Sequence, residues 1–204
     1  MNPERRRRPI LPGGGGVISI QTPVSSRHRE ATIDLLLVRH ARPAIDPSVP
    51  SREWPLSEDG RAAAAALRLP RHAYLVASDE PKAWQTLEPA GPVLRDARFG
   101  EVRREGEPWE GPFRELRRSY VDGADHPGWE RRADVARRFD DAVNDYLVRA
   151  QGRPVVIGSH GMAIAVWLTA RTGLTASGDF WEALRFPDVI GVDLRNRRVQ
   201  VHGP

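Results

Sequence analysis

The sequence predicts an α/β protein, a three-layer α/β/α sandwich with a mainly parallel central sheet. Two short segments, Ile33–Val38 and Arg153–Gly158, are dominated by apolar, β-compatible residues without alternation, the pattern of strands buried on both faces. Helical patterns alternate with such segments along the chain, as in strand–helix–strand units. The 204 residues are enough for one full domain and too few for two comfortable ones.

The first 30 residues differ in composition from the rest. Arg5–Arg8 and Gly13–Gly16 lie in a stretch with little periodic apolar content, so residues 1–30 are predicted to form a disordered basic and glycine-rich tail. The four glycines interrupt the apolar segment that a signal peptide needs, which argues against export. The folded domain is expected over residues 31–204.

Composition favours a soluble globular protein. Hydrophobic residues make up 40% and charged residues 28% of the chain, and no apolar run approaches the roughly 20 residues of a membrane span. Cysteine is absent, which excludes disulfides and thiol nucleophiles and fits a cytoplasmic protein. The net charge is +4, but beyond the tail the arginines are interleaved with acidic residues, so a nucleic-acid partner is not expected.

The first strand is expected to end before Pro43, which cannot donate a ladder hydrogen bond. A proline-rich loop then leads to a helix that begins after Ser57, a suitable N-cap, and continues through the alanine run Ala62–Ala66. A second strand is predicted at Ala73–Ala77 and is followed by a helix start within Ser78–Thr86.

Ser78 is expected to cap this second helix, and Pro81 suits its first turn. Pro92–Leu94 has the pattern of a third, weaker strand. Residues 98–128 contain several prolines and are interpreted as an irregular excursion over the sheet rather than core. The remaining predicted elements are a helix at 129–150, the strand at 153–158, a helix at Met162–Thr172 closed by Gly173, and an edge hairpin of Val189–Leu194 and Arg198–Val201.

Three predicted strands are each followed by side chains that suit an anion. Arg39 and His40 follow the first, Lys82 lies shortly after the second, and His160 follows the fourth. In a parallel sheet these strand ends share one edge, where the ligands of open α/β sheets bind. Cations and imidazoles at one point destabilise each other's charge, whereas a phosphate dianion gives each a charge-assisted hydrogen bond. We therefore predict a phosphate site there.

The order and spacing of these segments resemble the histidine phosphatase superfamily, the phosphoglycerate mutase-like fold. The resemblance rests on Val38-Arg39-His40-Ala41, Ser78–Thr86 and Ser159-His160-Gly161, and it runs from about Ile33 to Leu194. It implies that His40 attacks phosphorus to give a phosphohistidine, because neutral imidazole is nucleophilic. It also implies that Arg39 and His160 hold the phosphoryl oxygens.

The family also uses a carboxylic acid to protonate the departing alkoxide and then to activate water. Its Asp-x-Arg-Leu-x-Glu pattern maps onto Asp96–Glu101 and makes Glu101 the general acid and base. A second register of the same segment points to Asp96. We prefer Glu101, because Val102 and the later Trp109–Gly111 also resemble the family.

Two positions depart from the family pattern. Lys82, the only lysine of the chain, stands where arginine is usual, and lysine binds phosphate as a point charge without a bidentate fork. The loop after Ala41 lacks the hydroxyl and amide that help to cradle phosphate in the family. Arg42 is expected to compensate as a phosphate ligand, with an exposed surface arginine as the equal alternative.

The excursion 103–128 corresponds to the region that covers the pocket in the family. Its shortness favours a phosphatase over a mutase, which must exclude water through its whole cycle. We expect a phosphomonoesterase acting through phospho-His40 on a small phosphorylated metabolite or a phosphorylated protein, without metal or cofactor. A phosphomutase and a catalytically weakened phosphoester-binding protein are the alternatives.

Overall fold

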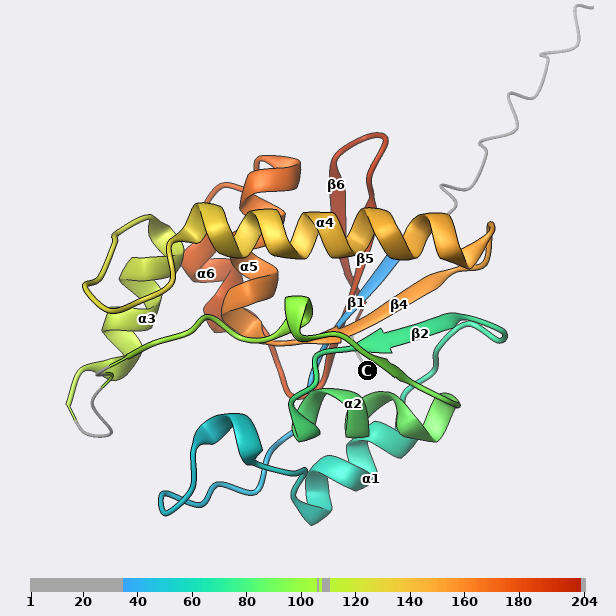
Figure 1. Ribbon diagram of the computed structural model, residues 1–204, viewed down its shortest axis with the longest axis horizontal. Helices are drawn as coiled ribbons and strands as arrows, with labels where there is room; N and C mark the ends of the chain where they lie inside the picture. Colours follow the sequence, from blue (N-terminus) through green and yellow to red (C-terminus); the bar gives the residue numbers. More distant parts are fainter. Residues whose placement is uncertain (1–34, 106, 108–110, 203–204) are drawn as a thin grey trace, which may run out of the picture. The chain divides into compact units, whose positions relative to one another are not determined.

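The computed structural model describes residues 35–105, 107 and 111–202. Six strands form one central sheet, in the order β3-β2-β4-β1-β5-β6 (Figure 1). They are β1 (Leu35–Arg39), β2 (Tyr74–Ala77), β3 (Leu94–Arg95), β4 (Val155–Ser159), β5 (Asp188–Asp193) and β6 (Arg198–His202). Strands β3, β2, β4 and β1 are parallel, whereas β5 pairs antiparallel with both β1 and β6. The predicted mainly parallel sheet is confirmed, while the predicted tail lies outside the described residues.

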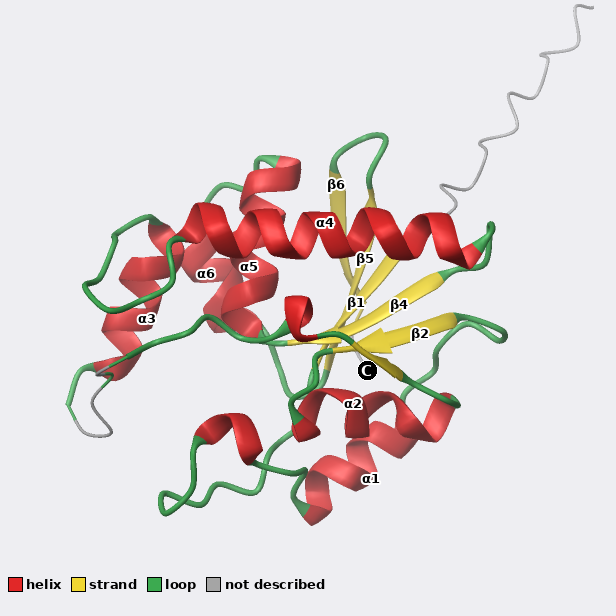
Figure 2. Ribbon diagram, viewed as in Figure 1, coloured by secondary structure: helices red, strands yellow, loops and turns green. Residues whose placement is uncertain are grey.

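Helices cover both faces of the sheet (Figure 2). Helices α1 and α2 lie on one face, and α4 and α5 lie on the other, with α3 and α6 packed against α5. Their bounds are α1 Glu58–Ala66, α2 Pro81–Leu87, α3 Phe113–Asp122, α4 Arg132–Ala150, α5 Gly161–Thr172 and α6 Ser177–Ala183. The three-layer sandwich is confirmed. In the part of the chain that the structure describes, no helix has the length and apolarity to cross a bilayer.

Alternate residues of β1 belong to two separate cores, which explains the unbroken apolar run. Leu35 and Leu37 belong to the larger cluster, formed with residues of α4 and α5. Leu36 and Val38 belong to the smaller cluster, formed with Ala83 and Leu87 of α2. Burying an aliphatic side chain of this size stabilises the fold by about 1.5–3 kcal/mol. The strand is therefore packed on both faces up to its last residue, Arg39, which is followed by His40.

Two of the predicted helix ends are confirmed and one is wrong. Ser57 caps α1 by accepting the Gly60 N–H at 3.0 Å, and Gly173 closes α5 in the left-handed region, with φ of 75°. Helix α2 instead has Glu80 as its N-cap, with Pro81 in the first turn. Ser78 was expected to be this cap. Its hydroxyl instead accepts the N–H of Glu80, the residue before the helix begins, at 3.2 Å.

The interpretation of the 98–128 segment as irregular is wrong for residues 113–122. These residues form helix α3, which ends at Gly123 with φ of 127°. Tyr120 and Val121 are buried in the larger core, so this part of the excursion packs as core rather than only crossing the sheet. The narrow apolar face of this helix is hard to recognise in the sequence, because prolines flank the segment and arginines are frequent within it.

Gly60 is the position where helix propensity and packing disagree. In a helix interior, alanine is favoured over glycine by about 0.8–1.0 kcal/mol. A Cβ at Gly60, however, would lie 2.1 Å from the Arg42 carbonyl oxygen, in the loop that follows His40. We expect Gly60→Ala to destabilise the protein in urea unfolding and to lower its affinity for inorganic phosphate. The exposed Ala65→Gly variant of the same helix should lose only about 1 kcal/mol and keep phosphate binding. A stabilised Gly60→Ala protein would contradict this packing.

Candidate active site

The parallel pairing of β1 and β4 brings two histidines together. Arg39 is in register with Ser159, and the His40 N–H donates to the Ser159 carbonyl at 3.0 Å. His160 directly follows β4, and the two imidazole rings meet edge to face with their centroids 5.1 Å apart. His40 is 6% exposed and His160 is fully buried. The predicted meeting of these strand ends is thus observed.

His40 is held as a neutral imidazole with one nitrogen free. Its Nδ1 lies 2.7 Å from the Ala41 carbonyl oxygen, which only accepts hydrogen bonds, so Nδ1 carries the proton and Nε2 keeps its lone pair. Burial lowers the pKa of His40 well below its usual 6.5, and the charges of His160, Lys82 and Arg39 lower it further against the Ala41 hydrogen bond. This is the protonation state of a nucleophile.

Arg39 is held by a loop from the far end of the chain. One terminal N–H donates to the Leu184 carbonyl at 2.6 Å, and the guanidinium lies over the Phe186 ring, 3.6 Å from its centroid. Burial lowers the pKa of Arg39 to about 10, although Glu101 and Asp188 act to raise it. The side chain therefore remains a cation at neutral pH.

Buried nitrogens of Arg39 and His160 lack hydrogen-bond partners in the described part of the chain. They are Nε of Arg39 and both ring nitrogens of His160. Leaving a buried polar group unpaired costs about 1–3 kcal/mol, so such groups are uncommon without a functional reason. Donors gathered around a nucleophilic imidazole suit a tetrahedral oxyanion, which accepts several hydrogen bonds at once.

Lys82 lies near the two histidines, as predicted, but its charge is already engaged. Its ammonium donates to Glu80 Oε2 and to the Ser51 carbonyl, both at 2.6 Å. Burial opposes ionisation of Glu80, but His160, Lys82 and the Glu101 N–H outweigh it and lower its pKa to about 2. The site therefore contains a carboxylate beside the lysine that was expected to bind phosphate.

The Glu101 carboxylate lies at the N-terminus of α5, the helix that follows His160. Its Oε1 accepts the N–H groups of Val102 at 2.9 Å and Ala163 at 3.0 Å. Burial disfavours its charge, but Arg104, His160 and the Val102 N–H have the larger effect together and lower the pKa of Glu101. In the ligand-free protein Glu101 is thus a carboxylate, the form that accepts a proton.

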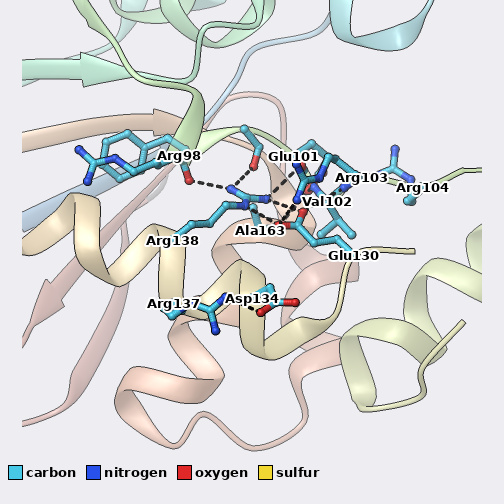
Figure 3. Close-up of polar contacts among 12 residues, drawn as sticks. Arg98, Glu101, Val102, Arg103, Arg104, Glu130, Asp134, Arg137, Arg138 and Ala163 are labelled. Carbon is cyan, nitrogen blue, oxygen red and sulfur yellow. Dashed lines mark hydrogen bonds and ion pairs between the residues drawn. The ribbon is translucent and has the colours of Figure 1, made fainter. Parts of the chain in front are cut away.

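Arg138 of α4 fixes the segment that carries Glu101 (Figure 3). Its guanidinium donates to the carbonyl oxygens of Arg98 at 2.6 Å, Gly100 at 2.9 Å and Glu101 at 3.2 Å. It also pairs with the buried carboxylate of Glu130 at 2.8 Å. Three carbonyls on one planar group leave this segment little freedom, so the Glu101 carboxylate is preorganised.

The other predicted site residues lie apart from this cluster. Asp96 forms an ion pair with Arg98 at 2.7 Å, and no hydrogen bond or ion pair joins it to either histidine among the described residues. Arg42 is exposed, and only its carbonyl takes part in a described hydrogen bond, accepting from the Ser57 N–H and hydroxyl. The geometry favours Glu101 over Asp96, and no described hydrogen bond or ion pair joins the Arg42 side chain to the histidines.

Several residues of the site were not predicted. Thr86 links the first two motifs, because its hydroxyl accepts the Ala41 N–H at 2.9 Å and donates to the Lys82 carbonyl at 2.7 Å. The sequence signal for Glu80 is its place two positions before Lys82, a predicted cation of the site. Phe186 gives no sequence signal, since its contact with Arg39 joins segments far apart in the chain.

Among the described residues, no cluster of three or more His, Asp or Glu side chains could hold a metal ion.

The two lowered histidine pKa values predict how stability depends on pH. His40 and His160 both have folded-state pKa values below 6.5, because burial disfavours their charged forms. Unfolding below pH 6.5 therefore takes up protons, so stability is complete above pH 6.5 and falls as the pH is lowered. The loss is up to about 1.4 kcal/mol per pH unit for each histidine. Glu80 and Glu101 have lowered pKa values and do not titrate in this range.

Urea unfolding at about pH 7.5 and 5.5 measures this effect. His40→Asn should lose less stability between the two conditions than the wild type does, by about 1.4 kcal/mol. An equal loss in both proteins would show that His40 titrates normally in the folded state.

Comparison with known proteins identifies a family whose model matches most of the chain. A family model described as histidine phosphatase superfamily (branch 1) matches residues 35–194. No curated protein sequence matches the chain significantly.

Solved structures with the same fold include three informative examples. A mycobacterial glucosyl-3-phosphoglycerate phosphatase in complex with VO3 is 28% identical with a TM-score of 0.56, covering 82% of this chain and 96% of that one. A protein described as mycobacterial hydrolase 2 is 26% identical with a TM-score of 0.57, covering 82% and 88%. YhfR of Bacillus stearothermophilus, 22% identical with a TM-score of 0.58 and covering 83% and 95%, shares the fold. Since the family model spans most of the chain, the protein belongs to the histidine phosphatase superfamily.

Proposed function

We propose that the protein is a phosphomonoester hydrolase that works through a phosphohistidine at His40. The observation that carries the proposal is a buried, neutral His40 with a lone pair on Nε2, next to nitrogens of Arg39 and His160 that have no hydrogen-bond partner among the described residues. A nucleophile and oxyanion donors in one water-poor site are the requirements of phosphoryl transfer. Family membership supports the same chemistry.

In the first step, His40 Nε2 attacks phosphorus in line with the leaving oxygen. The N–P bond forms as the P–O bond breaks, and protonated Glu101 gives its proton to the departing alkoxide. A bound phosphate dianion raises the pKa of a nearby carboxyl by like-charge repulsion, which favours that protonated form. Arg39 and His160 stabilise the charge spread over the equatorial oxygens.

In the second step, Glu101 acts as a base. Its carboxylate takes a proton from water as the water oxygen attacks phosphorus, and the N–P bond breaks. Inorganic phosphate leaves, and His40 returns to the neutral form with its proton on Nδ1. The Ala41 carbonyl holds this ring orientation throughout both steps, because it accepts from Nδ1 at 2.7 Å.

A small phosphorylated metabolite with further negative charge is the proposed substrate class. Arg114 and Arg117 of α3 lie close enough to Arg39 for their charges to lower its pKa, behind the larger effect of burial. Arg117 is already paired with Glu107 at 2.6 and 2.8 Å, so Arg114, which lies 3.9 Å from Glu182, is the cation that best suits a leaving group with its own anionic substituent. The similar mycobacterial phosphatase acts on glucosyl-3-phosphoglycerate by its name, which makes this compound a rational first substrate.

A phosphoester-binding protein of low activity is the second candidate. It is favoured by Lys82, whose ammonium is already paired with Glu80. Release of inorganic phosphate should be measured with 4-nitrophenyl phosphate, glucosyl-3-phosphoglycerate and a set of sugar phosphates and phosphopeptides. Turnover with release of phosphate supports the hydrolase. Tight binding without turnover would identify the binding protein, and transfer of phosphate between positions of the substrate would identify a mutase.

A further inference from the structure

Glu80 places a carboxylate inside the proposed phosphate site, and neither chemical step uses it. Its side chain is 13% exposed. Oε2 lies 2.6 Å from Lys82 Nζ, whereas Oε1 accepts the Glu101 N–H at 3.0 Å and lies 3.4 Å from His160 Nε2. A buried carboxylate repels an incoming phosphate dianion, so its presence here needs a compensating role.

Ion pairing with Lys82 involves only one of the two oxygens of the Glu80 carboxylate, Oε2. The other oxygen, Oε1, accepts the Glu101 N–H and lies at ion-pair distance from His160. Glu80 thus joins three parts of the site: the helix start that carries Lys82, the backbone at Glu101, and the histidine after β4. The approach to His160 is the one with chemical consequences, because Oε1 lies 3.4 Å from Nε2 while neither ring nitrogen has a hydrogen-bond partner in the described residues.

The charge on His160 depends on a balance among its neighbours. Burial disfavours the imidazolium form most strongly. The charged and titratable groups that act on this ring are Glu80, Glu101, Lys82, Arg104 and His40. The two carboxylates favour a proton on His160, and the two cations oppose it. Glu80 has the largest favourable effect, so it counters the loss of charge that burial causes.

We propose that Glu80 is a positioning residue for His160. Its Oε1 lies 3.4 Å from Nε2, at ion-pair distance but outside hydrogen-bond geometry in the ligand-free protein, and its negative charge favours the tautomer with the proton on Nε2. When a phosphate dianion binds, His160 takes one proton from solvent at Nδ1 and becomes an imidazolium with two donors. One N–H then points to Glu80 and the other to a phosphoryl oxygen, a charge-assisted hydrogen bond. The inference rests on the proposed function only for the identity of the anion.

The tautomer of His160 in the wild-type protein gives the first test. Nitrogen-15 NMR distinguishes a protonated ring nitrogen from an unprotonated one, and the spectrum of His160→Asn assigns the signals. We expect His160 to be protonated at Nε2 in the ligand-free protein at neutral pH. A proton on Nδ1 alone would overturn the proposal, and this measurement depends on no variant of Glu80.

The second test removes the charge of Glu80 and keeps its shape. In Glu80→Gln we expect the pKa of His160 to fall by one unit or more and the Kd for inorganic phosphate near pH 7 to rise about tenfold. The matched control is Asp79→Asn, which removes an exposed carboxylate from the preceding position and should leave both values unchanged. An unchanged His160 titration in Glu80→Gln would overturn the proposal.

The two tests separate this inference from the proposed function. If the wild type fails to hydrolyse phosphoesters while His160 has the Nε2–H tautomer and responds to Glu80→Gln, the pairing stands and the hydrolase proposal fails. If hydrolysis occurs and His160 does not respond to Glu80→Gln, the hydrolase proposal stands and Glu80 has no positioning role.

Discussion

His40→Asn is expected to lower kcat/KM for 4-nitrophenyl phosphate on the order of 10⁶-fold, the effect of removing a nucleophile that forms a covalent intermediate. Asparagine keeps a donor to the Ala41 carbonyl, which His40 Nδ1 now contacts at 2.7 Å, but it has no nucleophilic nitrogen at the position of Nε2. Steady-state release of nitrophenolate at substrate concentrations below KM measures the loss.

The matched control replaces a histidine outside the site. His72 is exposed and has a positive φ of 62°, a conformation that asparagine tolerates, so His72→Asn should keep full activity. Phosphate binding by His40→Asn should persist, because Arg39 and His160 remain. A His40→Asn protein that retains more than about one hundredth of the activity would contradict a covalent role for this residue.

Glu101→Gln is expected to separate the two chemical steps. With an alkyl phosphate, whose leaving oxygen needs a proton, the rate should fall about 10²–10⁴-fold. With 4-nitrophenyl phosphate the first step needs no acid, so nitrophenolate should appear in a rapid burst. The phosphoenzyme should then accumulate, because the Glu101 carboxylate no longer takes a proton from water. Rapid-mixing kinetics with the two substrates measures both effects.

Asp96→Asn is the control for this prediction, because Asp96 was the competing position for the acid. It pairs with Arg98 at 2.7 Å rather than with the histidines, so its replacement should cost stability and little kcat. Equal losses in the rate of the first step with alkyl and aryl substrates in Glu101→Gln would mean that Glu101 does not protonate the leaving group. A leaving-group effect in Asp96→Asn would transfer that role to Asp96.

The sequence predicted the part of the site that follows from strand order. Arg39, His40 and His160 each follow a buried apolar strand, and parallel strands end at one edge of a sheet, so their meeting needed no side-chain detail. The position of Glu101 depended on a family pattern, which left Asp96 open until the contact between Glu101 and the α5 N-terminus was known. Buried strands and their ends are therefore the predictable features of this fold.

The features that were missed depend on contacts between distant segments. Phe186 and Leu184 hold Arg39 from a loop near the end of the chain, and no local pattern marks such a contact. Glu80 lies within a motif segment, yet its meaning depends on the 3.4 Å approach to His160, which arises only when β2 and β4 pair. Helix α3 was missed because its apolar face is carried by few residues among many arginines.

Trapping the phosphoryl group on the protein tests the central claim most directly. Wild-type and Glu101→Gln proteins should be mixed with a phosphorus-32-labelled phosphoester, quenched in base and digested, and the labelled peptide identified. We predict a base-stable, acid-labile label on His40, in greater amount in Glu101→Gln and absent from His40→Asn. Release of phosphate by the wild type with no label on His40 in either protein, or with an acid-stable label elsewhere, would contradict the account.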